Sequence, residues 1–596
     1  MILHQGDPRR RRAEKLEWLP EAKRDAWVSA EAAAAAQIID RDARQRFGDR
    51  SAIRPVQGHE PDAYLCEMGK HRALHLENLI ENTAEIITLG WLNSRVEPLD
   101  GRPFSYQGDR PEADQLGGMI KRAMCPIWWR RQMRRACVRR HESRSINAGQ
   151  IGVRRAWYCT SDTVRRRGLQ VARNAAILAA TELENEAGQT FTLAELVAVS
   201  PSAKPIRRGE LMTRIRGCEE WALARGMVGV FTTNTAPSRF HSQGGSNPNH
   251  QGETPRDAQV WLCKTWARAR AALQRKHIGA FGFRVAEPHK DACPHWHMLL
   301  WCQPAELDQM LSIVRKAWLK HEGDEPGAAE HRFNFEVMDE RGAIAYIAKY
   351  ISKNIDDTGS VGAEGHIDGG ETLRAAPRDR QDDLFDTTPA RRVESWAAAW
   401  GIRQFQAIGQ PPVTVWRELR RVDAATAAGG TARLQAAAAA VHKDGTKRAD
   451  WCAYMTAQGG AMRGRRYLLR LSVRDTEIVG AYETKTTPKP YGVFDVSRPT
   501  VHLVSNRKQW KPRGTWTTAE RSGRTLRNEI LGTAPKAIDP PWTRFSNCTE
   551  QGTRAGFGSL MNELLNRNDA MSLPKKQAGG PIHHQTEPPP CHAPPH

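Results

Sequence analysis

The stretch Pro294-His-Trp-His-Met-Leu-Leu-Trp301 is the part of the sequence that most constrains the fold. Its short apolar and aromatic run predicts a buried β-strand. Successive side chains of a strand point to opposite faces of the sheet, so His295 and His297 are expected on the same face. Two imidazoles side by side on one strand predict half of a site for a divalent metal ion.

Two histidines need a third ligand to hold a catalytic ion, and Glu287 is the residue that we favour. A turn within residues 288–294 would return Glu287 to the same site, while His289 and Asp291 remain alternatives in that loop. Two imidazoles and one carboxylate leave coordination positions open for a phosphate oxygen. Such a mixed nitrogen and oxygen set accepts Mn²⁺ readily, and Mg²⁺ when phosphate oxygens complete the shell.

Neighbouring residues disfavour two other interpretations of the two histidines. Cys293 has no second cysteine nearby, which disfavours a zinc site. Histidine-triad hydrolases need a third alternating histidine, and Leu299 occupies that position. The remaining alternative is a His-x-His pair on a half-exposed strand without any metal.

A second informative segment, Tyr346-Ile-Ala-Lys-Tyr350-Ile-Ser-Lys353, follows the histidines in the chain. Tyrosines at i and i+4 lie on one face of a helix, where core packing is the plain alternative to catalysis. A phenol titrates at about pH 10, so a nucleophilic tyrosine needs a neighbouring cation. Lys349 and Lys353 each follow a tyrosine by one helical turn. Together with a metal site, this pattern suggests phosphodiester cleavage through a phosphotyrosine intermediate.

The overall charge favours a polyanionic partner. The net charge is +21 and the isoelectric point is about 9.7, which suits phosphate neutralisation with release of counterions. Within residues 122–225 the run Trp128-Trp129-Arg130-Arg131 interleaves indoles with guanidinium groups. Guanidinium groups would meet phosphates and indoles would stack on bases. The alternative is a solvated helix face with its tryptophans on the core side.

Cysteine usage and hydropathy indicate the compartment. The eleven cysteines are scattered and form no Cys-x-x-Cys pair, which is typical of a reducing cytosol. No apolar run approaches the length needed to span a bilayer, and the start lacks the apolar stretch of a signal peptide. We therefore expect a cytoplasmic protein with no membrane partner.

The chain of 596 residues is too long for one core, and we expect an α+β protein. Its central domain would hold an antiparallel sheet flanked by helices, with predicted strands at 228–235, 278–285 and 294–301. The predicted regions are an N-terminal helical region (1–120), a basic helical DNA-binding region (121–225), the central domain (226–356), a linker or loop (357–390), a Trp-rich extension (391–423), a mixed C-terminal region of unknown role (424–573) and a disordered tail (574–596).

The order of these motifs resembles that of the HUH endonucleases, and within them the bacteriophage replication gene A protein family. Three segments carry the resemblance: 231–241 resembles the first strand motif of the family, 287–297 its metal motif, and 345–354 its twin-tyrosine motif. Flanking matches at 206–217, 400–406 and 415–420 extend the likeness over roughly residues 120–422. The family usually has Gly-Thr where this chain has Ala292-Cys293, and apolar residues where it has Thr232 and Asn234.

The resemblance implies a cycle of rolling-circle replication. One tyrosine would attack a phosphorus in single-stranded or extruded origin DNA, become linked to the 5′ phosphate and free a 3′ hydroxyl as primer. The second tyrosine would later cut the regenerated origin, and the new 3′ end would close the circle. The chain contains no P-loop motif, so a separate host helicase is expected to unwind DNA in the bacterial cytoplasm.

Three alternatives stay open at this point. Relaxases and single-strand transposases share the chemistry, but relaxases commonly place the tyrosine before the histidines, which is the reverse of the order here. A non-catalytic basic nucleic-acid-binding protein would explain the charge alone. A degenerate prophage copy would retain the motifs without the activity.

Overall fold

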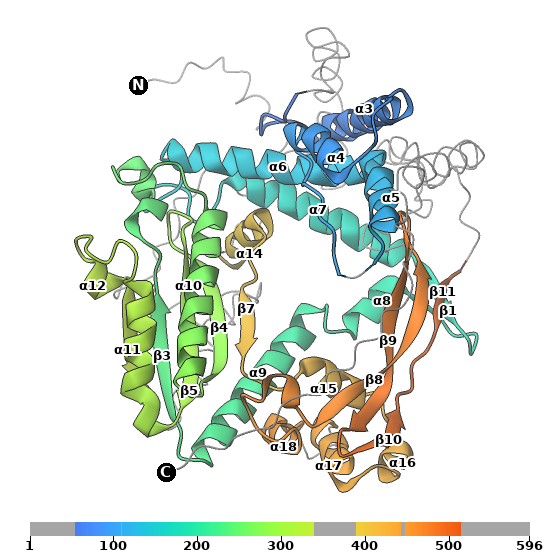
Figure 1. The fold of residues 1–596 in the computed structure, drawn as a ribbon, viewed down its shortest axis with the longest axis vertical. Coiled ribbons are helices and arrows are strands. Elements are labelled where there is room, and N and C mark those ends of the chain that lie inside the picture. The colour runs from blue at the N-terminus through green and yellow to red at the C-terminus, as the bar shows by residue number, and fades with distance from the viewer. Residues whose placement is uncertain (1–53, 109, 339–388, 443–447, 514–596) are drawn as a thin grey trace, which may run out of the picture.

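The computed structural model describes residues 54–108, 110–338, 389–442 and 448–513, where helices flank antiparallel sheets (Figure 1). The predicted α+β class is confirmed. The central sheet has five strands in the order β6-β3-β5-β4-β7, and each pairing is antiparallel. Its strands are β3 (Val228–Asn234), β4 (Phe281–Pro288), β5 (Pro294–Cys302), β6 (Phe333–Val337) and β7 (Phe405–Ile408).

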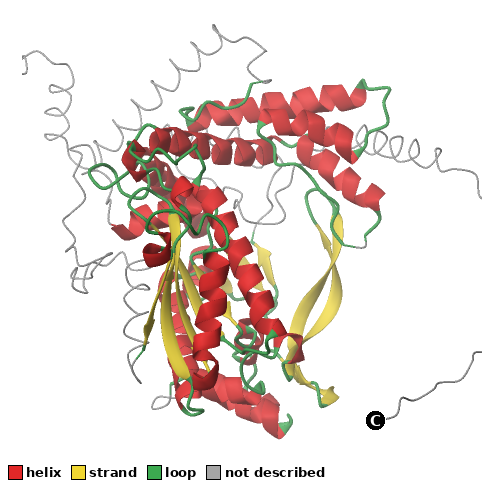
Figure 2. Cartoon of the chain, turned by 60° about the vertical axis from the view of Figure 1, so that its left-hand side comes forward, coloured by secondary structure: helices red, strands yellow, loops and turns green. Residues whose placement is uncertain are grey.

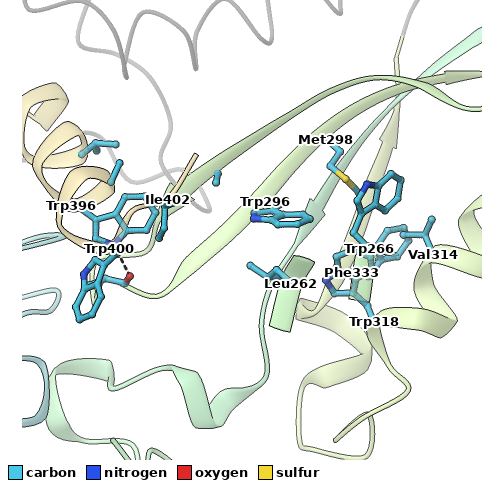
Figure 3. Close-up of a cluster of buried hydrophobic side chains, with 14 of the residues drawn as sticks. Leu262, Trp266, Trp296, Met298, Val314, Trp318, Phe333, Trp396, Trp400 and Ile402 are labelled. Atoms are coloured by element: carbon cyan, nitrogen blue, oxygen red, sulfur yellow. Dashed lines mark hydrogen bonds between the residues drawn. The ribbon is translucent and has the colours of Figure 1, made fainter. Parts of the chain in front are cut away.

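The middle strand β5 is buried along its whole length, because helices cover both faces of the sheet. Trp296, Met298 and Leu300 face one helical layer, and Figure 3 shows Trp296 and Met298 among its buried side chains. That layer consists of α10 (Pro255–Arg275), α11 (Leu307–Trp318) and α14 (Pro389–Trp400). Leu299 and Trp301 face the second core. Its helices are α9 (Lys204–Leu223), α15 (Val413–Leu419), α17 (Ala432–Val441) and α18 (Trp451–Ala457).

The N-terminal part of the described chain is helical and has a core of its own. Its helices are α3 (Asp62–Glu81), α4 (Leu89–Val96), α5 (Glu112–Ala123), α6 (Pro126–Asn147) and α7 (Ser161–Ala180). Trp128 and Trp129 of α6 are buried in this core, so the suggestion that these indoles stack on bases is wrong. Amphipathic packing places the indoles inside and leaves the arginines at the surface. None of the helices described here is long and apolar enough to cross a membrane.

Two smaller antiparallel sheets tie the C-terminal part of the described chain to the N-terminal helices. One has the order β10-β9-β8 and the other β11-β1-β2. Glu483, between β8 and β9, forms ion pairs with Arg110 at 2.7 Å and with Arg122 on α5. Figure 2 shows the long twisted strands of this hairpin apart from the central sheet. The remaining elements are β1 (Glu182–Asn185), β2 (Thr190–Thr192), α8 (Leu193–Ala198), α12 (Ala328–His331), α16 (Ala424–Ala428), β8 (Leu469–Val479), β9 (Thr484–Asp495), β10 (Arg498–Val504) and β11 (Trp510–Pro512).

The three predicted central strands are present as β3, β4 and β5, although β4 begins three residues later than expected. The two edge strands β6 and β7 were not predicted. β7 comes from the segment expected to be a separate extension, yet it pairs with β4 in the central sheet. The expected helix with the tyrosines and the predicted tail (574–596) lie outside the described residues. So does the predicted linker (357–390), except for its last two residues, which begin α14.

Gly282 of β4 has no room for a side chain, because the backbone of β5 lies against it. A Cβ there would lie 1.9 Å from the carbonyl oxygen of Leu299, a backbone atom that moves only if the strands separate. Gly282→Ala is therefore expected to reduce the free energy of unfolding by roughly 2–3 kcal/mol, measured by urea titration. Gly209→Ala in α9 is the matched control, because nothing lies within 4 Å of its added Cβ and alanine favours the helix. Equal midpoints for the two variants would contradict this close approach.

Candidate active site

The register of β4 and β5 brings Glu287, His295 and His297 together. Glu287 pairs directly with His295, and His297 lies two residues further along β5, opposite Val285. Cross-strand partners, and residues two apart on one strand, share a face of the sheet. The three side chains therefore point to the same side, as the alternation of β5 predicts.

The potential ligand atoms of these residues converge. The Nε2 atoms of His295 and His297 are 2.9 Å apart, and Oε2 of Glu287 lies 3.9 Å from Nε2 of His297. All three ligand atoms lie within 4.8 Å of one another. The side chains are buried, and their residues are only 2–7% exposed. A carboxylate buried beside two imidazoles is costly unless a shared proton or cation compensates its charge.

Strand β3 orients His297 from the opposite side. Oγ1 of Thr233 lies 3.2 Å from Nδ1 of His297, and the ring of Phe231 stacks on the imidazole with centroids 5.4 Å apart. With Nδ1 occupied by Thr233, Nε2 is the nitrogen that faces His295. Ligating histidines in metal sites are commonly oriented by such outer contacts.

The polar residues Thr232 and Asn234 bond to each other on the other face of β3, although Oδ1 of Asn234 is buried without a hydrogen-bond partner. Nδ2 of Asn234 donates to Oγ1 of Thr232 at 2.8 Å and to the carbonyl oxygen of Trp296 at 3.3 Å. Buried polar groups are tolerated when they are hydrogen-bonded. This pairing gives a physical reason why two polar residues fit where the resembling family is apolar.

The turn between β4 and β5 is tight and internally bonded. The amide of His289 donates to the carbonyl oxygen of Cys293 at 2.7 Å, and the amide of Ala292 donates to His289 at 2.8 Å. Ala292 has φ +74°, the left-handed region that favours glycine. The Gly usual in the resembling family fits this conformation without strain. Here Nε1 of Trp396 donates to the carbonyl oxygen of Ala292 at 2.9 Å and helps to hold the turn.

His289 and Asp291, the alternative third ligands, are engaged differently. The His289 ring packs on His295 with centroids 4.0 Å apart, whereas Asp291 faces His241. Oδ2 of Asp291 lies 3.3 Å from Nδ1 of His241, and its Oδ1 accepts the amide of Cys293 at 3.1 Å. Glu287 is therefore the carboxylate that the structure brings to the two histidines.

Sequence reasoning missed the buried His241–Asp291 pair. Burial opposes the charged forms, but Cys293 and Asp291 raise the pKa of His241 well above its usual range. Burial likewise opposes ionisation of Asp291, and the His241 partner with the Cys293 amide holds its pKa far below the usual range. His241 ends the segment 231–241, but nothing in its local pattern indicates a partner across the turn.

Residues 89–358 match the family model described as bacteriophage replication gene A protein. The chain belongs to this family. It is 38% identical over 388 residues to the replication gene A protein of Escherichia phage 186, an alignment that covers 64% of this chain and 52% of the relative. It is 34% identical over 462 residues to the replication protein of Haemophilus phage HP1, covering 74% of this chain and 54% of that protein.

Prophage-encoded relatives are also similar. A probable replication endonuclease from a prophage-like region of Shigella boydii is 29% identical over 455 residues, covering 73% of this chain and 52% of the relative. The chain thus spans about half the length of the curated relatives it matches. No solved structure matches it.

The family resemblance implies a divalent metal, and the donor set fits one. Two ligands about 2.1 Å from an ion and at right angles to each other are about 3.0 Å apart, close to the 2.9 Å between the two Nε2 atoms. A hydrogen bond between the imidazoles would give the same distance, and an ion would replace it. Cys293 is not part of this group, and burial raises the pKa of its thiol.

The predicted catalytic residues Tyr346, Tyr350, Lys349 and Lys353 lie outside the described residues. The described chain resumes at α14, which packs in the layer behind the sheet.

His297→Ala is expected to weaken Mn²⁺ binding by more than about 100-fold, because it removes a ligand rather than a supporting group. Isothermal titration of the full chain with Mn²⁺ measures this loss without any substrate. His442→Ala is the matched control, since His442 is exposed and bonds to the carbonyl oxygen of Val422. Unchanged Mn²⁺ affinity in His297→Ala would remove this residue from the metal site.

His241→Gln should give a pH-dependent loss of stability. The pKa of His241 is raised in the folded chain, so its stabilising contribution is complete below about pH 6.5 and is lost as the pH rises through the raised value. The pKa of Asp291 is depressed, so its contribution is lost only in acid. We expect His241→Gln to lower the free energy of unfolding by about 3 kcal/mol at pH 6 and by less at alkaline pH, measured by urea unfolding in EDTA. A cost that is the same at both pH values would contradict the charged pair.

Proposed function

We propose that this chain is a site- and strand-specific DNA endonuclease that initiates rolling-circle replication of phage DNA. The observation that carries the proposal is the buried group of Glu287, His295 and His297 on paired strands of the central sheet. In the chain it is followed by the Tyr346 and Tyr350 pair, in a family whose relatives are named replication proteins and replication endonucleases.

The three buried residues would hold Mn²⁺ or Mg²⁺. When bound, the ion would polarise a non-bridging oxygen of the scissile phosphate and offset the negative charge that develops there. Glu287, opposite His295, supplies the one anionic ligand of the set. Thr233 and Phe231 keep the His297 ring directed toward the same point.

The tyrosines supply the nucleophiles in this proposal. The phenolate oxygen of one tyrosine attacks the phosphorus, the bond from phosphorus to the 3′ oxygen breaks, and that oxygen leaves with a proton as a 3′ hydroxyl. Lys349 and Lys353 would lower the cost of forming each phenolate. In the later step a 3′ hydroxyl attacks the phosphotyrosine, and the phenol is regenerated as the circle closes.

The order of the chain is compatible with this arrangement. β6 runs antiparallel to β3, and Phe333 at its start pairs with Asn234, the β3 residue that also pairs with Trp296. Tyr346 follows Val337, the last residue of β6, by nine positions in the sequence.

The DNA strand and a host replicative helicase are the proposed partners, in the cytoplasm of the bacterial host. The shared chemistry leaves a relaxase or single-strand transposase as the alternative function. The position of the tyrosines after the histidines favours the replication initiator.

The test is a denaturing gel of the full chain with labelled single-stranded DNA tiled across its own gene, with Mn²⁺, Mg²⁺ or EDTA. We expect labelled protein that survives denaturation, requires the metal and disappears in Tyr346→Phe/Tyr350→Phe. Tyr491→Phe, which removes one phenol elsewhere in the described chain, should leave the adduct unchanged. His295→Ala should abolish cutting while largely sparing DNA binding.

Binding without a cut or an adduct across the whole tiling would instead support a non-catalytic DNA-binding protein or an inactive prophage copy. An adduct that persists in the double tyrosine variant would reject these two nucleophiles.

A further inference from the structure

Arg139 and Arg256 meet at the end of α14, and two more arginines are near enough to interact with them electrostatically: Arg135 with Arg256, and Arg102 with Arg135. Arg135 and Arg139 lie on α6, Arg256 is the second residue of α10, and Arg102 lies in the segment between α4 and α5. Figure 1 shows α6 and α7 running across the upper part of the view, with α10 and α14 below them. These four residues are referred to as the arginine cluster.

Two of the guanidinium groups converge on one point. Nη2 of Arg139 donates to the carbonyl oxygen of Trp400 at 3.3 Å, and Nη1 of Arg256 donates to the same oxygen at 3.0 Å. A Cβ added to Gly401 would lie 3.3 Å from Arg256 and 3.4 Å from Arg139, so both groups border this glycine. The end of α14 thus holds two like charges side by side.

No carboxylate of the described residues forms an ion pair with any of the four arginines. Asp257, the nearest in sequence, is used to cap α10, where it accepts the amide and the hydroxyl of Thr254 at 3.0 and 2.7 Å. Arg256 also lies in the first turn of α10, where the helix dipole disfavours a cation and favours an anion. Partial burial and then the charges of Arg256 and Arg135 lower the pKa of Arg139 to about 10.

Backbone carbonyls at the end of α14 bind only two of the four arginines. They bind Arg139 and Arg256, as expected for cations at a helix C-terminus. Arg102 and Arg135 are exposed and take no part in those hydrogen bonds. Because both side chains are open to solvent and lie outside the cap, they can bind an external anion without disturbing the end of α14.

We propose that the arginine cluster is a second DNA contact, which binds backbone phosphates outside the nucleotides that are cut. The inference rests on the proposed function for its ligand. α10 and α14 cover the face of the sheet opposite His295 and His297, so the cluster is separate from the metal centre. Guanidinium groups bind phosphate oxygens through paired hydrogen bonds, and four of them suit a polyanion better than a single small ion.

The test compares two double variants of the full chain with equal loss of charge. Arg102→Gln/Arg135→Gln removes the two exposed members of the cluster and leaves the α14 cap intact. Arg270→Gln/Arg275→Gln is the matched control, because both arginines are exposed on the same helix as Arg256, roughly 20–30 Å further along it. Binding of a labelled single-stranded 30-mer is measured by fluorescence anisotropy in EDTA over a range of salt concentrations.

Each phosphate contact with single-stranded DNA contributes about 0.7 to the slope of log affinity against log salt. The cluster variant should therefore bind with a slope shallower by about 1.4 and roughly tenfold or more weakly at 0.1 M salt. The control variant should retain the wild-type slope. If the two variants have equal slopes while the wild-type chain binds DNA, the arginine cluster is not a phosphate contact, and the proposed function is unaffected. Absence of DNA binding by the wild-type chain would overturn the proposed function and the cluster together.

Discussion

The antiparallel pairing of β4 with β5 is the constraint on which the candidate active site depends, because Glu287 reaches the histidines in only one register. A slip of one residue would turn Glu287 to the opposite face, since side chains alternate along a strand. The bonded turn from His289 to Cys293 and the close approach at Gly282 both support the observed pairing. The register is therefore at once a feature of the fold and a feature of the site.

Several buried polar side chains around this hairpin are paired with one another, which offsets part of the cost of their burial. Thr232 and Asn234 bond to each other, Thr233 bonds to His297, and Asp291 bonds to His241. An isolated buried charge is strongly unfavourable, and these pairings avoid it. Glu287 fits the same pattern if a cation is shared with the two imidazoles. The arrangement supports a site preorganised by the sheet rather than one assembled from loops.

Local periodicity was sufficient to predict the central strands and the shared face of His295 and His297. Alternation of side chains along a strand is a local property. A tight turn between the two strands is the one further assumption needed to place Glu287 on the same face. The edge strands β6 and β7 are short, so local patterns did not predict them. β7 also joins the sheet from a segment that begins after residue 388, far from β4 in the sequence. The ion pairs of Glu483 with Arg110 and Arg122 join residues far apart in the chain, and such contacts leave no periodic signal.

Burial was harder to predict from sequence than secondary structure. The run around Trp128 and Trp129 is equally compatible with base stacking and with a helical core, and packing against α3, α4 and α5 decides for the core. The His241–Asp291 pair depends on how the chain between β3 and α10 folds over the turn. Its members are fifty residues apart, as the numbering shows. For the tyrosines, the sequence and the family resemblance remain the basis of the proposal.

The central claim is that paired strands present Glu287, His295 and His297 to a single divalent ion. The most direct measurement is anomalous diffraction from crystals of the chain grown with Mn²⁺. The account predicts a peak within about 2.5 Å of both Nε2 atoms and of a Glu287 carboxylate oxygen. Mn²⁺ bound instead at the more exposed group of Glu220, Asp450 and Cys452, with the imidazoles still bonded to each other, would contradict it.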